Sequence, residues 1–185
     1  MDKKILDSLL IDTGQDRVDH TLRVVEESKK LAYVHSVDID KATQAAFLHD
    51  CAKFKDGKNL LKMAVDFDII LSDIMRASLD LIHAPLGAKI AEHKYNIKDS
   101  DILNAIKYHT TGRKDMTKLE KIIYIADYIE PYRKFHGVKE VRQLAYVDLD
   151  KSLLLAMNQT IIFLIEKNRL ISPDTIEARN QFINN

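Results

Sequence analysis

The chain has 185 residues, a length that predicts one domain, residues 1–185, with a sizeable core. Hydrophobic residues make up 46% of the sequence and charged residues 30%, which is typical of a globular protein and excludes a disordered chain. The 28 Lys and Arg residues balance the 28 Asp and Glu residues, so we expect no large basic surface and no nucleic-acid partner. The 5 glycines and 3 prolines are too few for the turns of a β-sandwich or barrel, and they favour an all-α fold.

The apolar residues follow a helical period along nearly the whole chain, and no segment alternates convincingly like a strand. N-cap residues and prolines suggest where several of these helices begin and end. In chain order, the sequence predicts helices from about Arg17 to Tyr33, from near Asp40 through Ala52, from Lys58 to Val65, from Ser72 or Asp73 to Leu81, through Pro85 to Ala91, from Asp99 or Ser100 through Ile106, from Asp115 to Ile129 with Pro131 ending it, from about Asp150 to Lys167 as the longest, and after Ser172 and Pro173.

Cysteine content and hydropathy indicate the cellular compartment in which the protein is expected. The single cysteine, Cys51, excludes an internal disulfide and fits a reducing environment. The first residues, MDKKILDSLLIDTG, lack the apolar region of a signal peptide. The most apolar stretch, Leu153 to Ile165, contains Asn158, Gln159 and Thr160, and is too short to span a bilayer. We therefore expect a cytoplasmic protein with no membrane partner.

The dipeptide His49-Asp50, in AAFLHDCAKF, is the first candidate for chemistry. The dipeptide alone is weak, because about 0.8 copies are expected by chance from this composition. Its context is more informative, since Asp50 lies among small apolar residues that would bury its carboxylate. A buried carboxylate must be paired or bound to a cation. The alternative is a core aspartate that is satisfied by hydrogen bonds.

Other His and Asp residues extend this candidate site. Asp127, in KIIYIADYIEPYR, lies inside a predicted helix where it caps nothing, so it is either a ligand or half of a buried ion pair. His20 lies on the inner side of the first predicted helix, where a lone histidine is more often a satisfied core residue than a ligand. His83 and His109 lie where a helix ends and a turn begins, which can direct a side chain into a cleft. The remaining histidines are expected to be solvated: His35, His93 and His136.

The order His20, His49-Asp50, His83, His109, Asp127 resembles the HD-domain metal-dependent phosphohydrolase superfamily, which has an all-α helical bundle fold. The motifs HDCAKF, HAPLGA, YHTTGR and ADYIEPYR are similar to those of bacterial HD-domain enzymes that split diadenosine tetraphosphate symmetrically. The resemblance extends from Arg17 to about Thr175. The chain departs from the pattern at Cys51, Ala84 and Tyr132, none of which removes a ligand. Ala84 and Tyr132 affect the shape of the pocket.

The resemblance implies a metal centre and a set of catalytic residues. One metal ion would be held by His20, His49, Asp50 and Asp127, and Asp50 would bridge to a second ion held by His83 and His109. Asp50, His83 and His109 would then be the catalytic residues. Imidazole with carboxylate suits transition metals better than magnesium. One or two ions are expected, iron by family resemblance, while manganese, zinc or nickel would also suit these ligands.

Further residues are expected to bind the polyphosphate and the nucleoside. Arg133 follows Asp127 across Pro131 and could bind a phosphate, unless it is a solvated cation at a helix end. Lys53 is expected on the helical face of His49, and Arg17 and Arg23 flank His20, so each could contact a phosphate or support a ligand. The segment before the last helix could hold an adenine, or could be an ordinary turn. The full set of expected nucleotide-binding residues is His20, Asp50, His83, His109, Thr110, Asp127, Arg133, Leu170, Ile171, Ser172, Pro173, Asp174 and Thr175.

These observations predict a hydrolase that uses a metal-activated water to convert diadenosine tetraphosphate into two ADP. Its partners would be the small-molecule dinucleoside polyphosphate and the ADP product, and the chain could pair as a homodimer. Another HD-domain phosphohydrolase, such as a nucleotidase or a cyclic-nucleotide phosphodiesterase, would share the metal ligands and differ in the pocket wall. A non-catalytic nucleotide-binding module and a plain helical scaffold are the alternatives from other classes.

Overall fold

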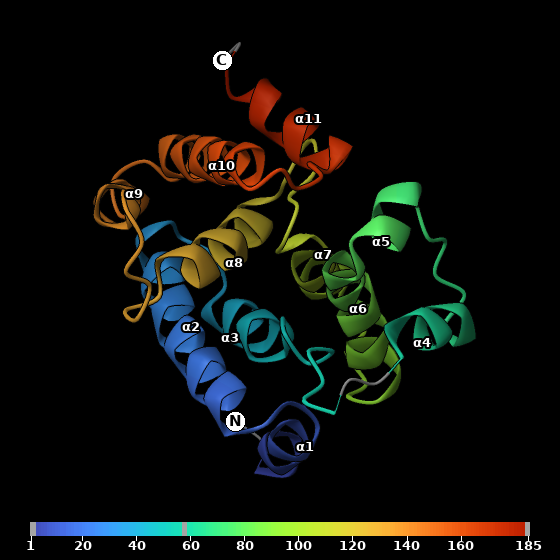
Figure 1. The fold of residues 1–185 in the computed structure, drawn as a ribbon. Coiled ribbons are helices and arrows are strands. Elements are labelled where there is room, and N and C mark those ends of the chain that lie inside the picture. The colour runs from blue at the N-terminus through green and yellow to red at the C-terminus, as the bar shows by residue number, and fades with distance from the viewer. Residues whose placement is uncertain (1–2, 57–58, 184–185) are drawn as a thin grey trace.

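A computed structural model describes residues 3–56 and 59–183. These residues form α-helices and one short 3₁₀ helix, and no strand occurs among them. Figure 1 shows the helices around a centre formed by α2, α3, α7 and α8. The elements are α1 (Lys3–Thr13), α2 (Gln15–Val34), α3 (Ile39–Leu48), α4 (Leu60–Asp66), α5 (Asp73–Ala77), η1 (Leu79–Ile82), α6 (His83–His93), α7 (Ser100–Tyr108), α8 (Lys118–Ile129), α9 (Val138–Ala145), α10 (Leu149–Glu166) and α11 (Pro173–Gln181).

Side-chain caps fix the starts of many helices, as the sequence predicted. The Asp99 carboxylate accepts hydrogen bonds at the start of α7, and the Ser72 hydroxyl accepts one at the start of α5. Pro85 lies in the first turn of α6, and Pro173 is the first residue of α11. The capping prediction at Asp115 is wrong, because this residue has a left-handed φ of 57° and α8 begins after Thr117.

Thr117 caps α8 better than Asp115 would, because it forms a capping box with Glu120. The Thr117 hydroxyl accepts from the Glu120 backbone N–H, and the Glu120 carboxylate accepts from the Thr117 N–H. Arg113 in turn donates two hydrogen bonds to the buried Glu120 carboxylate. The loop between α7 and α8 is therefore tied to the helix that it introduces.

Several predicted boundaries differ from the structure. The helix predicted through Ala52 ends at Leu48, and turns follow it. The helix predicted to reach Leu81 divides at Ser78 into α5 and η1. With 20 residues, α2 is longer than α10 with 18, which corrects the prediction for the longest helix. Lys58, the predicted start of α4, lies outside the described residues, and α1 and α9 were not predicted.

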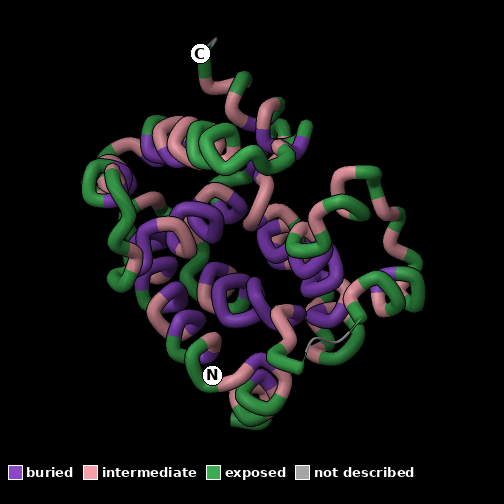
Figure 2. The backbone as a smooth tube through the Cα atoms, in the orientation of Figure 1, coloured by how far each residue is buried: buried purple, intermediate pink, exposed green. Residues whose placement is uncertain are grey.

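The core lies where α2, α3, α6, α7 and α8 pack together, and Figure 2 shows buried backbone concentrated there. α8 supplies five fully enclosed apolar residues to it: Ile122, Ile123, Ile125, Ala126 and Ile129. α10 is different, because its first half is buried through Leu153 and Met157 while Ile162, Phe163 and Ile165 are exposed. None of the described helices is both long and apolar enough to cross a membrane.

Candidate metal centre and active site

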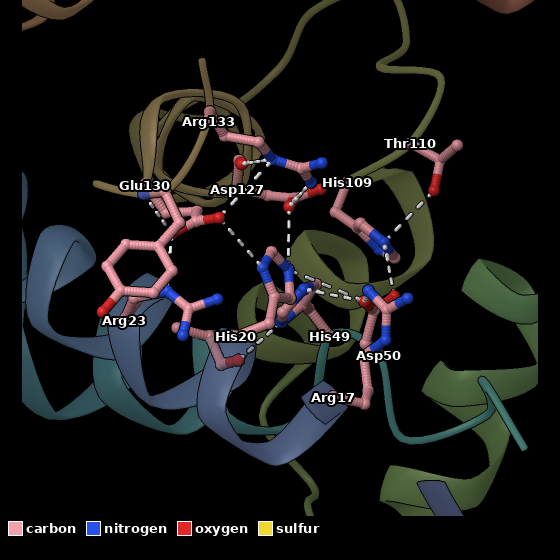
Figure 3. Close-up of polar contacts among 12 residues, drawn as sticks. Arg17, His20, Arg23, His49, Asp50, His109, Thr110, Asp127, Glu130 and Arg133 are labelled. Atoms are coloured by element: carbon pink, nitrogen blue, oxygen red, sulfur yellow. Dashed lines mark hydrogen bonds and ion pairs between the residues drawn. The ribbon is translucent and has the colours of Figure 1, made fainter. Parts of the chain in front are cut away.

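Four histidines and two aspartates converge at the centre of the bundle, and we name these six residues the His/Asp cluster. They come from five different helices or helix ends, so the packing of the bundle brings them together. Figure 3 labels all of them except His83. His83 lies at the end of η1, as predicted, but α6 begins there in place of the predicted turn, and His109 caps the C-terminal end of α7 as predicted. The cluster consists of His20 in α2, His49 and Asp50 after α3, His83 in α6, His109 after α7, and Asp127 in α8.

The Asp50 carboxylate lies between two pairs of histidines. Its Oδ2 atom is 3.3 Å from Nε2 of His49 and 3.9 Å from Nε2 of His20. Its Oδ1 atom is 3.3 Å from Nε2 of His83 and 3.5 Å from Nε2 of His109. Each carboxylate oxygen therefore faces its own pair of imidazole nitrogens, an arrangement in which one carboxylate can bridge two cations.

The Nδ1 atoms of the clustered histidines contact oxygen atoms on the outer side of the cluster. His49 Nδ1 is 2.7 Å from the Ala46 carbonyl oxygen, and His109 Nδ1 is 2.7 Å from that of Ile106. His83 Nδ1 donates in the same way to the Asp80 carbonyl. A backbone carbonyl can only accept, so Nδ1 carries the proton in these three rings and, in a neutral ring, the Nε2 lone pair faces the cluster.

These nitrogen atoms fit a transition metal. Nε2 of His20 and Nε2 of His49 are buried, and neither has a hydrogen-bond partner among the described residues. Nε2 of His83 lies 3.1 Å from Nε2 of His109, close to the separation of about 3 Å between two nitrogens that bind one ion at ~2.1 Å. Ligand atoms within 4.8 Å of one another form three overlapping groups: His20, His49 and Asp50; His49, His109 and Asp127; and Asp50, His83 and His109.

Both aspartates of the cluster are held in the ionised state. Burial alone would raise the pKa of Asp50, but the neighbouring imidazoles of His49, His109 and His83 hold it well below its usual range. Burial also opposes ionisation of Asp127, whose pKa is lowered by His20, His49 and Arg133. Burial lowers the pKa of His83, which favours the neutral ring that a metal ligand requires.

Arg17 and Arg133 each contact one of the aspartates. Arg17 Nη1 donates to Asp50 Oδ2 at 2.8 Å, and Arg133 Nη2 donates to Asp127 Oδ1 at 2.6 Å. Arg133 also donates through Nε to the Asp127 carbonyl at 3.1 Å. Arg133 is therefore not the isolated solvated cation of the alternative interpretation, and both guanidinium groups lie at the edge of the cluster.

Glu130 is a site residue that the sequence analysis missed. Its side chain is buried, and its Oε1 atom lies 3.5 Å from Nδ1 of His20. Arg23 binds the other oxygen at 2.7 Å and covers the ring of Tyr132, so it supports Glu130 instead of reaching the cluster. The signal was an acidic residue immediately before Pro131, which the sequence analysis treated only as a helix end. Tyr132, a departure from the family pattern, packs on Arg23.

A cavity of about 240 Å³ opens onto the cluster, and we name it the central cavity. The Thr110 hydroxyl lies within it, 3.2 Å from Nε2 of both His83 and His109. Lys53 also lines it, as do Arg17 and Arg133. Lys53 reaches this position from a turn and not from the helical face of His49, because α3 has already ended.

The segment from Leu170 to Thr175 does not line the central cavity. Its residues up to Asp174 line a separate cavity of about 620 Å³, bounded on its other side by α5 and Leu81. Thr111 lines this cavity as well and immediately follows Thr110 of the central cavity. The Thr175 hydroxyl donates to the Thr111 carbonyl at 2.9 Å, which fixes the start of α11 beside the active site.

The histidines outside the cluster behave mostly as expected. His93 and His136 are exposed. His35 is half-buried, and its Nε2 atom lies 2.7 Å from the Ala145 carbonyl oxygen, so the prediction that it is simply solvated is wrong. Its contact joins the end of α2 to the end of α9, an element that the sequence analysis did not predict.

The helical bundle and its His/Asp cluster place the protein among the all-α proteins that bind a divalent metal. A family model described as the HD domain matches residues 17–132. The chain is 43% identical over 169 residues to a Halalkalibacterium halodurans protein named bis(5'-nucleosyl)-tetraphosphatase, symmetrical, with 91% of this chain and 90% of that protein covered. A protein of the same name from Bacillus subtilis is 41% identical, with the same coverage of both chains.

The similarity extends to a solved structure. A crystal structure of a predicted HD superfamily hydrolase involved in NAD metabolism, from Clostridium acetobutylicum, matches with a TM-score of 0.94 and 42% sequence identity. The match covers 98% of this chain and 96% of that one. The chain therefore belongs to the HD-domain family. The predicted all-α HD-domain fold is confirmed, and the family and the cluster together indicate a divalent metal.

Proposed function

We propose that the protein hydrolyses diadenosine tetraphosphate symmetrically and releases two ADP. The observation that carries the proposal is the Asp50 carboxylate, buried between two pairs of histidines beside a cavity that Arg17, Lys53 and Arg133 line. The names of the relatives from H. halodurans and B. subtilis support the same activity. We also propose that residues 1–185 act as one domain, since α10 and α11, outside the matched segment, pack against each other and α10 packs on α8.

The metal ligands would be His20, His49, Asp50 and Asp127 on one side and Asp50, His83 and His109 on the other. When bound, divalent ions would polarise the phosphoryl oxygens and lower the pKa of a water molecule. The family resemblance favours iron, and the mixed imidazole and carboxylate ligands also suit manganese, zinc or nickel. Elemental analysis of protein purified without chelators should find iron, whereas protein that binds none of these four metals would contradict the centre.

The residues around the cluster would bind and orient the polyphosphate. Arg133 and Arg17 already contact the carboxylates of the cluster, so their guanidinium groups can bind phosphate oxygens that approach the same point. The Thr110 hydroxyl, which contacts both His83 and His109, can donate a hydrogen bond to a phosphoryl oxygen there. These groups would hold the scissile phosphorus against the Asp50 side of the central cavity.

One adenosine of the substrate would occupy the cavity beside Leu170 to Asp174. This cavity has apolar walls from Leu81 and Ile171, and backbone groups at the start of α11 border it. The adjacent residues Thr111 and Thr110 connect it to the central cavity, so the first two phosphates of that half can reach the cluster. Attack at the second phosphorus of this half would leave two phosphates on each product, and both products would be ADP.

Hydrolysis in ¹⁸O-labelled water tests the position of cleavage. ADP should be the only product of diadenosine tetraphosphate, with one labelled and one unlabelled molecule released in each turnover. AMP and ATP together would mean asymmetrical cleavage and would contradict the placement of the adenosine. Nucleoside monophosphates and cyclic nucleotides belong in the same assay, because preferred hydrolysis of either would favour a nucleotidase or a phosphodiesterase.

The exposed part of α10 bears on the oligomeric state. Ile162, Phe163 and Ile165 form an apolar surface that the described residues leave uncovered, and a second copy of the chain would cover it in a homodimer. Light scattering coupled to gel filtration should give twice the chain mass, and Ile162→Lys should return it to the monomer. We place the protein in the cytoplasm, where the buried free thiol of Cys51 would stay reduced.

A further inference from the structure

A second cavity adjoins the metal centre on the side of α1 and the start of α2, and nothing assigned so far occupies it. We name it the α1–α2 cavity. Its volume is about 560 Å³, within the range of small-molecule pockets. Four of its lining residues also line the central cavity: Arg17, Lys53, His83 and Arg133. The two cavities therefore adjoin at these four side chains, and a ligand bound at the cluster lies next to both.

The α1–α2 cavity holds cations that have no protein partner. Most cations near the site are paired, as Arg17 is with Asp50 and Arg133 with Asp127. By contrast, the ammonium groups of Lys53 and Lys55 form no hydrogen bond or ion pair within residues 3–56 and 59–183. Both lysines line the cavity. Unpaired ammonium groups beside a metal centre favour the binding of an anion.

The substrate requires a place for its second half. If one adenosine lies beside Leu170 to Asp174, the four phosphates pass the cluster and the other ADP unit must lie beyond it. Figure 1 shows α1 and α11 at opposite ends of the molecule, with α3, α7 and α8 between them. The α1–α2 cavity is bounded by Thr13, the last residue of α1, and by Leu60 of α4, so it lies away from α11.

We propose that the α1–α2 cavity binds the leaving ADP half of diadenosine tetraphosphate, with Lys53 and Lys55 as its phosphate-binding residues. The inference rests on the proposed function. A water oxygen forms the new bond to the phosphorus of the first half, and the bond from that phosphorus to the central bridging oxygen breaks. The bridging oxygen keeps the electron pair and leaves on the second ADP, while the water releases its proton to solvent. Lys53 and Lys55 lie where they can bind the phosphates that this half carries in the substrate and in the product alike.

The remaining walls of the α1–α2 cavity suit a nucleoside. Ala52, Phe54 and Leu60 supply apolar surface, and Asp16 and Asp80 supply carboxylates that can accept hydrogen bonds from ribose hydroxyls. The cavity therefore has Arg17, Lys53 and Arg133 on the side that it shares with the central cavity, and Lys55 with the apolar and acceptor groups elsewhere. This distribution matches an ADP unit whose phosphates point toward the metal centre.

Steady-state kinetics of the double variant Lys53→Ala/Lys55→Ala provide the test. Both contacts would be made in the ground state and the transition state alike, so KM for diadenosine tetraphosphate should rise while kcat changes little. We expect a rise of about 10-fold, because partly exposed charge contacts to phosphate are weaker than buried ones. Lys53→Arg/Lys55→Arg should restore most of the loss. Lys139→Ala, an exposed lysine of α9, is the matched control and should leave KM unchanged.

Calorimetric titration with ADP provides a second readout that does not depend on turnover. Wild-type protein should bind a second, weaker ADP, and the double alanine variant should lose this event while keeping the first. A KM within about twofold of the wild-type value, together with an unchanged second binding event, would overturn the proposal. Wild-type protein that releases no ADP from diadenosine tetraphosphate would refute the proposed function instead, and the titration would still decide whether the second ADP site exists.

Discussion

The two sides of the Asp50 carboxylate are supported in different ways. On the Oδ2 side, His20 is held by Glu130, which Arg23 binds, and Asp127 is held by Arg133. These partners join α2 to α8 and to the residues that follow it. On the Oδ1 side, each histidine is oriented by a carbonyl only three residues before it, that of Asp80 for His83 and that of Ile106 for His109.

This difference separates a long-range charged network from a locally supported pair. On the Oδ2 side, His20 and Asp127 are held by contacts that join α2 to α8 and to the residues after it, whereas His49 is oriented locally by the Ala46 carbonyl. The Oδ1 side can follow small movements of α6 and α7, and its His83 and His109 line the central cavity together with Asp127 of the Oδ2 side. We infer that the Oδ2 side holds its ion more tightly, whereas the Oδ1 side responds to substrate. The substitutions below test that asymmetry.

Asp50→Ala should have the largest effect, because it removes the one group that faces both pairs of histidines. We expect loss of the bound metal and loss of hydrolysis to the detection limit. Asp50→Asn keeps the shape of the side chain and removes its charge, so it should retain the fold while losing most of the metal. Elemental analysis and initial rates measure both effects, and circular dichroism shows whether the helices remain.

Asp40→Ala is the matched control for these variants, since it removes an exposed carboxylate from the first turn of α3. It should leave metal content and rate at the wild-type level. Full metal content in Asp50→Ala would show that Asp50 is not the shared ligand, and the comparison of its two sides would lose its basis.

His83→Ala and His109→Ala should have the second-largest effect. They should lower turnover more than they lower metal content. Both residues lie closest to Oδ1 of Asp50, so we expect turnover to fall by about 100-fold or more while the ion on the Oδ2 side is retained. His20→Ala should instead lower the content of that ion. Equal metal loss in all three variants would mean that the two sides do not differ.

The sequence predicted the six residues of the His/Asp cluster better than it predicted the residues that hold them in place. The six cluster residues could be named because a His-Asp pair, further histidines and a distant Asp occur in a recognisable order. The supporting contacts are long-range, such as Arg23 with Glu130 across 107 positions, and helical periodicity contains no information about them. Glu130 in particular looked like an ordinary helix end.

Prediction of the fold from the sequence was limited in the same way. Helix starts that depend on a local cap, such as Asp99 for α7, were predicted, because the capping contact is made within three residues. The end of α3 was not, because His49 and Asp50 leave the helix to reach partners on other elements. Lys53 was misplaced for the same reason, since a helical face was assumed where the chain turns.

Arg133→Ala tests whether the pair with Asp127 also serves the substrate. Loss of a charged hydrogen bond costs ~1.5–3 kcal/mol, and the partial exposure of Arg133 places the effect near the lower end. We expect ADP affinity to fall by about 10- to 30-fold. Calorimetric titration measures it, with Arg169→Ala as a control on an exposed arginine outside the central cavity. An unchanged dissociation constant would limit Arg133 to supporting Asp127.

Glu130→Gln should have the smallest effect, and it tests the network of the Oδ2 side most directly. The amide keeps an oxygen that can face His20 and Arg23, but it removes the buried negative charge on which both contacts depend. Changes to groups that orient a metal-binding histidine cost about 10- to 100-fold in metal affinity or activity, and retention of shape places this variant near 10-fold. The loss should appear in metal affinity, measured by competition with a chelator, before it appears in kcat at saturating metal.

Glu140→Gln, which changes an exposed glutamate of α9, should affect neither quantity. Equal behaviour of the two variants would show that Glu130 does not support His20, and the Oδ2 side would then be no better held than the Oδ1 side.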